Sequence, residues 1–333
     1  MQSVSPPTDE EYLNELYDRF KDDEWIALQE QFNKVDDLVA AAQRAIDEGV
    51  FKQNQLDLAI EAVREPHSPS EYFRGTFINT LQRVVLGILE PHRQQLEGIP
   101  VGCLPTRTLN AGAYQTPRGG AVILLDQGVI FQLACLVRSY FAFYTWYAPE
   151  PYCRDHPRAA FGRTIQQLAA FCVSGDPTEL HRITTWKCSS LPYYDQVLET
   201  FAFGIELFIM LHECGHVVLN HFTTSSTLSV PLQPAGEMTV YTNSQLQEFE
   251  ADEFAFRCFV TGGMQACDVA FACGLLFNFF HLGELIRPPK TRTHPPALSR
   301  WEKIKNLAPL ADHPESWANY VDDTFVPLSV DLG

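Results

Sequence analysis

The chain has 333 residues, a formal net charge of −17 at pH 7 and 46% hydrophobic residues. This length and hydrophobic content are typical of a globular protein with one large core and an appended module. The acidic excess argues against non-specific binding to nucleic acid or to an anionic membrane, because such binding depends on positive charge.

Nine cysteines are scattered along the chain without a C-x-x-C pair, which favours buried free thiols in a reducing compartment. The N-terminal residues lack the basic segment and apolar core of a signal peptide. We therefore expect a cytoplasmic protein. Three long apolar segments, 128–148, 200–219 and 266–286, contain internal polar or charged residues. We expect them to be core helices, and we expect no membrane span.

The first predicted unit, residues 1–69, is an acidic helical N-terminal module. Leu13, Leu16 and Phe20 recur at helical spacing, and proline and glycine mark its end. Two interpretations stay open at this point. The module either recruits a substrate or a regulatory partner, or it is a helical cap on the rest of the protein.

The second predicted unit, residues 70–306, begins with a helix and continues into two strands at 107–114 and 120–126, joined by a Pro- and Gly-containing turn. Further helices are predicted at 128–148, 158–173, 193–221 and 245–260, and the polar segment 223–244 is predicted to be a loop. Residues 307–333 are expected to form a C-terminal tail. The fold class is α+β, mostly helical with a small β-sheet.

The helix predicted at 193–221 contains the sequence His212-Glu213-Cys214-Gly215-His216. Histidines four residues apart lie on one face of a helix, where both rings can bind one metal ion. Such an H-E-x-x-H motif predicts one zinc ion, with Glu213 as the general base that activates a water. The alternative is a chance match in which hydrogen bonds hold each histidine. The apolar surroundings favour a metal, because buried polar groups need a partner.

A third ligand is needed, and the following helix offers Glu248 and Asp252 at i and i+4. One carboxylate with two histidines leaves the fourth position to water, so Glu248 is the expected ligand. Asp252 is expected to accept the second ring N–H of a ligand histidine. Glu250 and Glu253 are expected to be solvated. His221 is the competing ligand, but on a straight helix it would face away from His212, so we expect it to cap the helix.

Four blocks resemble the HtpX and CAAX-prenyl-protease family of gluzincin metallopeptidases. They are Asn110-Ala-Gly-Ala113 with the strand after it, the H-E-x-x-H helix, Glu248-Phe-Glu-Ala-Asp252, and Thr293-His-Pro-Pro296 followed by Arg300. The resemblance implies a zincin-like metallopeptidase core. It also implies that His294 stabilises the oxyanion, that Arg300 assists near the site, and that Asn110, Ala111, Gly112 and Ala113 pair with the substrate backbone.

The sequence differs from this family in one respect. HtpX and prenyl proteases span the membrane several times, and we expect no membrane span here. The chain is closer in plan to soluble minigluzincins and to ImmA-like peptidases, so we do not carry over prenylated substrates. The sequence therefore predicts a zinc-dependent endopeptidase acting on a protein or peptide. The alternatives are a latent peptidase, or a non-catalytic metal-bound sensor or adaptor that binds a partner through its acidic helices.

Overall fold

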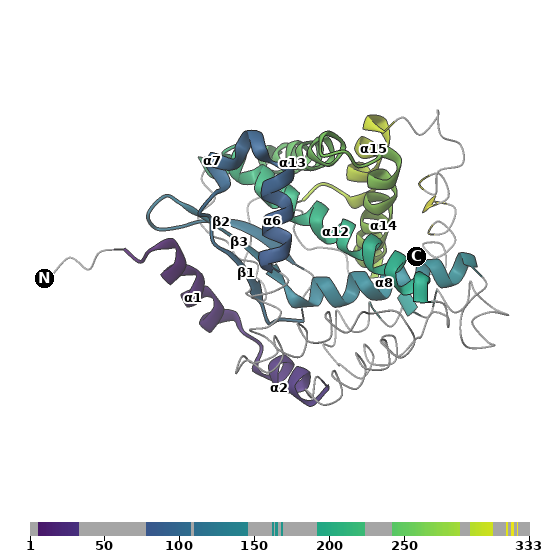
Figure 1. The fold of residues 1–333 in the computed structure, drawn as a ribbon, viewed down its shortest axis with the longest axis horizontal. Helices are drawn as coiled ribbons and strands as arrows, with labels where there is room; N and C mark the ends of the chain where they lie inside the picture. The colour runs from purple at the N-terminus through teal and green to yellow at the C-terminus, as the bar shows by residue number, and fades with distance from the viewer. Residues whose placement is uncertain are drawn as a thin grey trace, which may run out of the picture.

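The computed structural model describes residues 6–32, 78–107, 110–145, 162, 164–165, 168, 192–223, 242–286, 294–308, 318, 321–322 and 325. Most of the helix predicted at 158–173 and of the loop predicted at 223–244 lies outside these residues. In the described part, helices predominate and three strands form one small mixed sheet. This agrees with the predicted α+β class (Figure 1).

The sheet has the order β1-β3-β2, with β3 (Ala121–Asp126) in the centre. β1 (Val101–Leu104) pairs with it in parallel, and β2 (Ala111–Gln115) pairs with it antiparallel, with Ala113 opposite Ile123. Every residue of β3 is buried, because both of its faces are covered. β2 is an edge strand of this sheet. It begins at 111, not at 107 as predicted, and β1 was not predicted.

The N-terminal helix α1 (Asp9–Phe20) lies beside the sheet, and α2 (Asp23–Phe32) follows it, with Trp25 donating a hydrogen bond to Gln127, the residue directly after β3. Thr8 and Glu11 form a capping box at the start of α1. The buried residues of α1 pack on one face of the sheet in a small cluster, namely Leu13, Leu16, Leu104, Val122 and Leu124. A Cβ added at Gly102 would lie 2.7 Å from Cδ1 of Leu13, so glycine lets this leucine pack directly on the strand. The described beginning of the acidic module is thus a cover on the sheet.

The other face of the sheet and the main core belong to the remaining helices. Their bounds are α6 (Ile78–Ile88), η2 (Glu90–His92), α7 (Arg93–Leu96), α8 (Gln127–Thr145), α12 (Pro192–Val218), η3 (His221–Thr223), α13 (Thr242–Thr261), α14 (Ala266–Ile286) and α15 (Ala297–Leu307). Figure 1 shows α12 running through the middle of this group, between the sheet and α13 and α14. Among the C-terminal residues, Ala318, Val321 and Phe325 lie in the same core.

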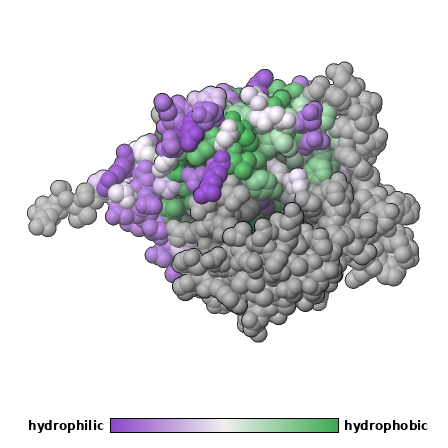
Figure 2. Space-filling model, in the orientation of Figure 1, coloured by the Kyte–Doolittle hydropathy of each residue, from purple (hydrophilic) through white to green (hydrophobic). Residues whose placement is uncertain are grey.

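Two stretches, Thr200–Val218 and Ala266–Leu285, are long and apolar enough to cross a membrane by length and composition alone. In each, 67% of the residues are buried inside the protein, and core helices of globular proteins have the same character. Figure 2 shows apolar residues gathered over the middle of the visible face, with hydrophilic residues toward α1.

Candidate metal centre

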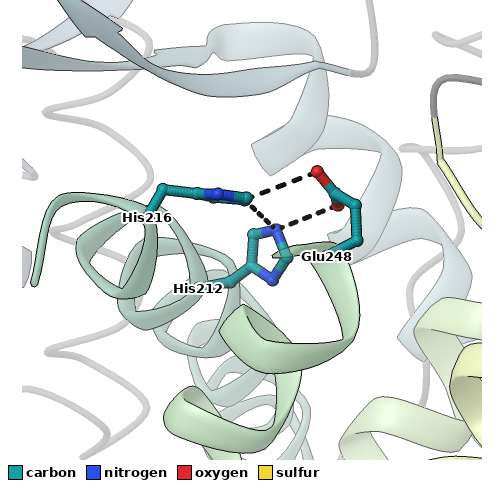
Figure 3. A group of neighbouring side chains, drawn as sticks. All are labelled: His212, His216 and Glu248. Atoms are coloured by element: carbon teal, nitrogen blue, oxygen red, sulfur yellow. Dashed lines mark hydrogen bonds and ion pairs between the residues drawn. The ribbon is translucent and has the colours of Figure 1, made fainter. Parts of the chain in front are cut away.

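The centre is built where α12 and α13 pack closely together. At Gly215 of α12, an added Cβ would lie 3.0 Å from Phe254 and 3.3 Å from the Cα of Ala251, both on α13. Glycine therefore permits this close approach of the two helices. The approach brings Glu248 of α13 over the histidine pair of α12 (Figure 3).

Three potential ligand side chains, His212, His216 and Glu248, converge on one point. The two histidine Nε2 atoms are 3.1 Å apart, and the Glu248 oxygens Oε2 and Oε1 lie 3.3 Å and 3.5 Å from Nε2 of His212 and His216 respectively. Ligands about 2.0–2.1 Å from a tetrahedral zinc ion are separated by roughly 3.3 Å. The three observed separations bracket this value.

The surroundings of Glu248 also indicate that a metal ion could bind between these three side chains. Its Oε2 atom is buried and receives no hydrogen bond of acceptable geometry, although ring nitrogens lie nearby. A buried carboxylate oxygen lacks a hydrogen-bond donor when the neighbouring side chains point to a common position and not to one another. A cation at that position would supply the missing partner. The donor set of two imidazoles and one carboxylate fits zinc. The residues therefore form a group that could hold a metal ion.

His212 is supported from behind by two buried charges. Its Nδ1 atom is 2.9 Å from Asp252 Oδ1, and Asp252 is fully buried. Arg300 of α15 donates two hydrogen bonds to Asp252, of 2.7 Å and 2.6 Å, and its guanidinium lies over the ring of Phe277. The structure thus places Asp252 where the sequence predicted it. Besides Asp252, Arg300 reaches the centre itself, because its Nη1 atom lies 3.8 Å from Oε2 of Glu248.

His216 is supported by a different pair of residues, which the sequence pattern did not predict. Its Nδ1 atom is 2.9 Å from Nδ1 of His221, and Nε2 of His221 is 3.2 Å from Oε2 of Glu250. The side chain of His221 therefore contacts His216 and Glu250, and does not act as the expected helix cap. Glu250 is exposed as expected, but it also binds His221.

The turn at Asn220 explains the position of His221. α12 ends at Val218, and Asn220 has a φ of 54°, in the left-handed region. Asparagine adopts this conformation more readily than other non-glycine residues and often ends helices with it. The expectation of a straight helix up to 221 was wrong, because the chain folds back at Asn220. The sequence signal that was overlooked is the asparagine directly before the histidine.

Glu213 lies beside the edge strand. Its carboxylate is buried and accepts a hydrogen bond from the backbone N–H of Ala113. The N–H of Asp126 bonds to the C=O of Asn110, and alternate residues bond across an antiparallel pair. The backbone groups of Ala111 and Ala113 therefore point away from β3, toward the centre. Tyr114, whose ring covers Gly112, lies on the sheet face that packs against α1.

His294 reaches the open side of the centre from just before α15. Its side chain is 61% exposed, and its Nδ1 atom is 2.9 Å from Oε2 of Glu248. The structure thus brings three histidines, His212, His216 and His294, next to the carboxylate of Glu248.

The two ligand histidines differ in proton affinity in the absence of a metal. Burial lowers the pKa of His212, but the nearby carboxylates of Asp252 and Glu248 outweigh this effect and raise the value to about 10. Burial and the nearby His212 lower the pKa of His216 to about 3. Burial raises the pKa of Glu213, and the charge of His212 partly offsets this rise. A metal ion must therefore displace a proton from His212.

Two further buried groups lie on α12. Burial raises the pKa of Glu206, which is 4% exposed, to about 8, so this carboxyl is neutral at neutral pH. Burial also raises the pKa of the free thiol of Cys214, which packs in the core as expected from its place in the motif. Neither group contacts the three potential ligands.

The comparisons with known proteins agree with this chemistry in general terms. The sequence model of the family Peptidase U49 matches residues 193–320, which include α12, α13, α14 and α15. The match covers every potential ligand but less than half of the chain, and it excludes the sheet. Searches of curated proteins and of solved structures gave no match. The similarity to a peptidase family supports a peptidase function.

Proposed function

We propose that the protein is a zinc-dependent endopeptidase of the gluzincin type, acting in the cytoplasm on a protein or peptide. The convergence of His212, His216 and Glu248 beside the buried carboxylate of Glu213 is the observation that carries the proposal. A structural zinc ion normally has four protein ligands, and three ligands with an open fourth position are typical of catalytic sites.

The substrate is expected to bind along β2. Ala111 directs its N–H and C=O away from β3, and Ala113 directs its C=O the same way, whereas the N–H of Ala113 is already bonded to Glu213. An extended peptide can add to this edge by hydrogen bonds to the first three of these groups. The scissile peptide bond would then lie between the strand and α12. This placement assigns to Asn110–Ala113 the role of substrate strand.

Zinc, when bound, polarises the scissile carbonyl and lowers the pKa of water toward about 7. Glu213 takes the proton of the attacking water and passes it to the leaving amine. Its raised pKa suits this task, because a base works best when its pKa approaches the working pH. His294, exposed at the open side, is assigned the stabilisation of the oxyanion.

The proposal is tested by measuring zinc content and cleavage of a proteome-derived peptide mixture by mass spectrometry. The variants are Glu213→Gln, Glu248→Ala and, as a control on the same helix as Glu248, Glu253→Gln. Glu253 pairs with Arg257 and Lys303 and lies outside the centre. We expect full zinc in all proteins except Glu248→Ala, and cleavage only by wild type and the control.

Two outcomes would contradict the proposal. A folded wild-type protein without zinc would remove the metal site. Full zinc in the wild type with no cleavage of any peptide would leave the alternative of a latent peptidase or a non-catalytic metal-bound adaptor.

A further inference from the structure

We propose that His221 and Glu250 are positioning residues that fix the ring of His216 in the form that binds the metal. The inference deepens the proposed function and rests on its metal site. It starts from two distances, 2.9 Å between the Nδ1 atoms of His216 and His221, and 3.2 Å between His221 Nε2 and Glu250 Oε2.

Only one arrangement of hydrogen atoms forms both hydrogen bonds in the row His216–His221–Glu250 and also leaves Nε2 of His216 unprotonated for a metal. The Nε2 atom of His216 faces His212 and Glu248, so a metal ligand at this atom carries no proton there. A neutral imidazole then has its hydrogen on Nδ1, and this N–H donates to Nδ1 of His221. His221 in turn has its hydrogen on Nε2 and donates it to the Glu250 carboxylate.

The reverse arrangement would block the metal. If His221 carried its hydrogen on Nδ1, it would donate to Nδ1 of His216 and leave the His216 hydrogen on Nε2, in the ligand position. Glu250 prevents this arrangement, because an ionised carboxylate only accepts hydrogen bonds and so draws the His221 hydrogen to Nε2. The choice of tautomer is thus passed from α13 through η3 to the ligand on α12.

The partners are well placed for this role. His221 is buried, and its backbone C=O accepts a hydrogen bond of 3.3 Å from Gln247, which fixes η3 against α13. The arrangement extends the usual carboxylate–histidine–zinc contact by one imidazole. It parallels the direct contact of Asp252 with His212.

The first test compares His221→Leu with His221→Asn. Leucine removes the acceptor, whereas the Oδ1 atom of asparagine can take the place of the histidine Nδ1 atom. Zinc affinity is measured by competition with a chelator. We expect about 10- to 100-fold weaker binding for leucine, in the range found when such supporting partners are removed, and recovery of most of this loss for asparagine. Thermal unfolding of the metal-free proteins shows whether each variant is folded.

The second test reverses the tautomer. Lysine is a donor only, so Glu250→Lys would leave Nε2 of His221 as an acceptor and move its hydrogen to Nδ1. We expect at least 10-fold weaker zinc binding and a changed visible spectrum of the cobalt-substituted protein. Glu253→Lys is the matched control, since it makes the same change of charge on the same helix but does not alter the hydrogen bonds between His216, His221 and Glu250. About 3-fold weaker zinc binding or less is expected for this control, from screened charge alone.

The outcomes separate this inference from the function that it rests on. Equal zinc affinity and equal cobalt spectra for wild type, His221→Leu and Glu250→Lys would overturn the role of the pair and leave the peptidase intact. Equal weakening by Glu250→Lys and Glu253→Lys would also overturn it. A wild-type protein that binds no zinc would refute the proposed function itself.

Discussion

The two ligand histidines of the candidate centre lie one turn apart on the same helix, but they are supported in opposite ways. His212 rests on Asp252 and Arg300, a pair of buried charges with Asp252 fully excluded from solvent. His216 rests on His221 and on Glu250, whose side chain is 62% exposed. The first support lies wholly in the core, whereas the second runs from the buried His221 to an exposed carboxylate. Loss of Asp252 should therefore lower the free energy of unfolding, whereas loss of Glu250 should lower only the affinity for the metal.

The largest effect is expected for Asp252→Ala. This change leaves the buried guanidinium of Arg300 without its partner, which costs about 3–5 kcal/mol of the free energy of unfolding. Urea unfolding of the metal-free protein measures it. Replacement of both residues, by Asp252→Ala with Arg300→Met, should restore much of the loss, because no unpaired charge remains. An unchanged stability in Asp252→Ala would show that the buried pair is not structural.

A pH-dependent effect is expected from Glu206, a buried carboxyl to which the described residues offer no such charged support. Its pKa in the folded protein is about 8, above its value of 4.5 in the unfolded chain, so the folded state binds the extra proton between these values. Stability contributed by the neutral form is therefore present below pH 4.5 and is lost as the pH rises toward 8. The loss amounts to roughly 2–4 kcal/mol.

Glu206→Gln should remove this dependence. The variant and the wild type are compared by urea unfolding at several pH values between 5 and 8. We expect the difference to grow in favour of the variant as the pH rises. Parallel curves for the two proteins would show that the carboxyl is not neutral in the folded state.

A smaller effect is expected where α12 meets α13. Gly215→Ala inserts a methyl group 3.0 Å from Phe254 and 3.3 Å from the backbone of Ala251, so α13 must shift by a few tenths of an ångström, at a cost of about 1–2 kcal/mol. Zinc binding should weaken with it, because the shift moves Glu248 away from the histidines. The matched control is Gly204→Ala in the same helix. There no atom of the described residues lies within 4 Å of an added Cβ, and the better helix propensity of alanine should stabilise by about 0.5–1 kcal/mol. Similar unfolding curves for the two variants would contradict the close packing.

The smallest effect on folding is expected for Glu250→Ala. Contacts of exposed charged side chains contribute about 0–1 kcal/mol, so the free energy of unfolding of the metal-free protein should change little. Its zinc affinity should nevertheless fall. A loss of stability as large as that of Asp252→Ala would remove the contrast between the two supports.

The sequence predicted the parts of the centre that depend on local spacing. The i, i+4 relations within 212–216 and within 248–252 place each pair on one helix face whatever the remainder of the chain does. The convergence of these two faces was inferred from the chemistry of a three-ligand site, and the structure brings the side chains together. Their roles with a metal remain predictions.

The parts that were missed depend on backbone geometry outside regular elements. The position of His221 follows from one left-handed residue, Asn220, which the pattern of apolar residues does not reveal. β1 has four residues between Pro100 and Pro105, too few for a period to be recognised. The support of His216 by Glu250 also could not be foreseen, because an exposed acid on a helix usually faces only water.

The acids that serve the two histidines all lie within five residues of α13, Glu248, Glu250 and Asp252. One residue of a helix corresponds to about 100° of rotation, so deleting the single residue Phe249 would rotate Glu250 and Asp252 together by this angle relative to Glu248. The spacing of these three acids along α13 therefore fixes their relative directions, and none of them can be shifted along the sequence independently of the others. A rotation of α13 about its own axis would move all three acids together. It would displace the expected ligand Glu248 and the acids that support His212 and His216 at the same time.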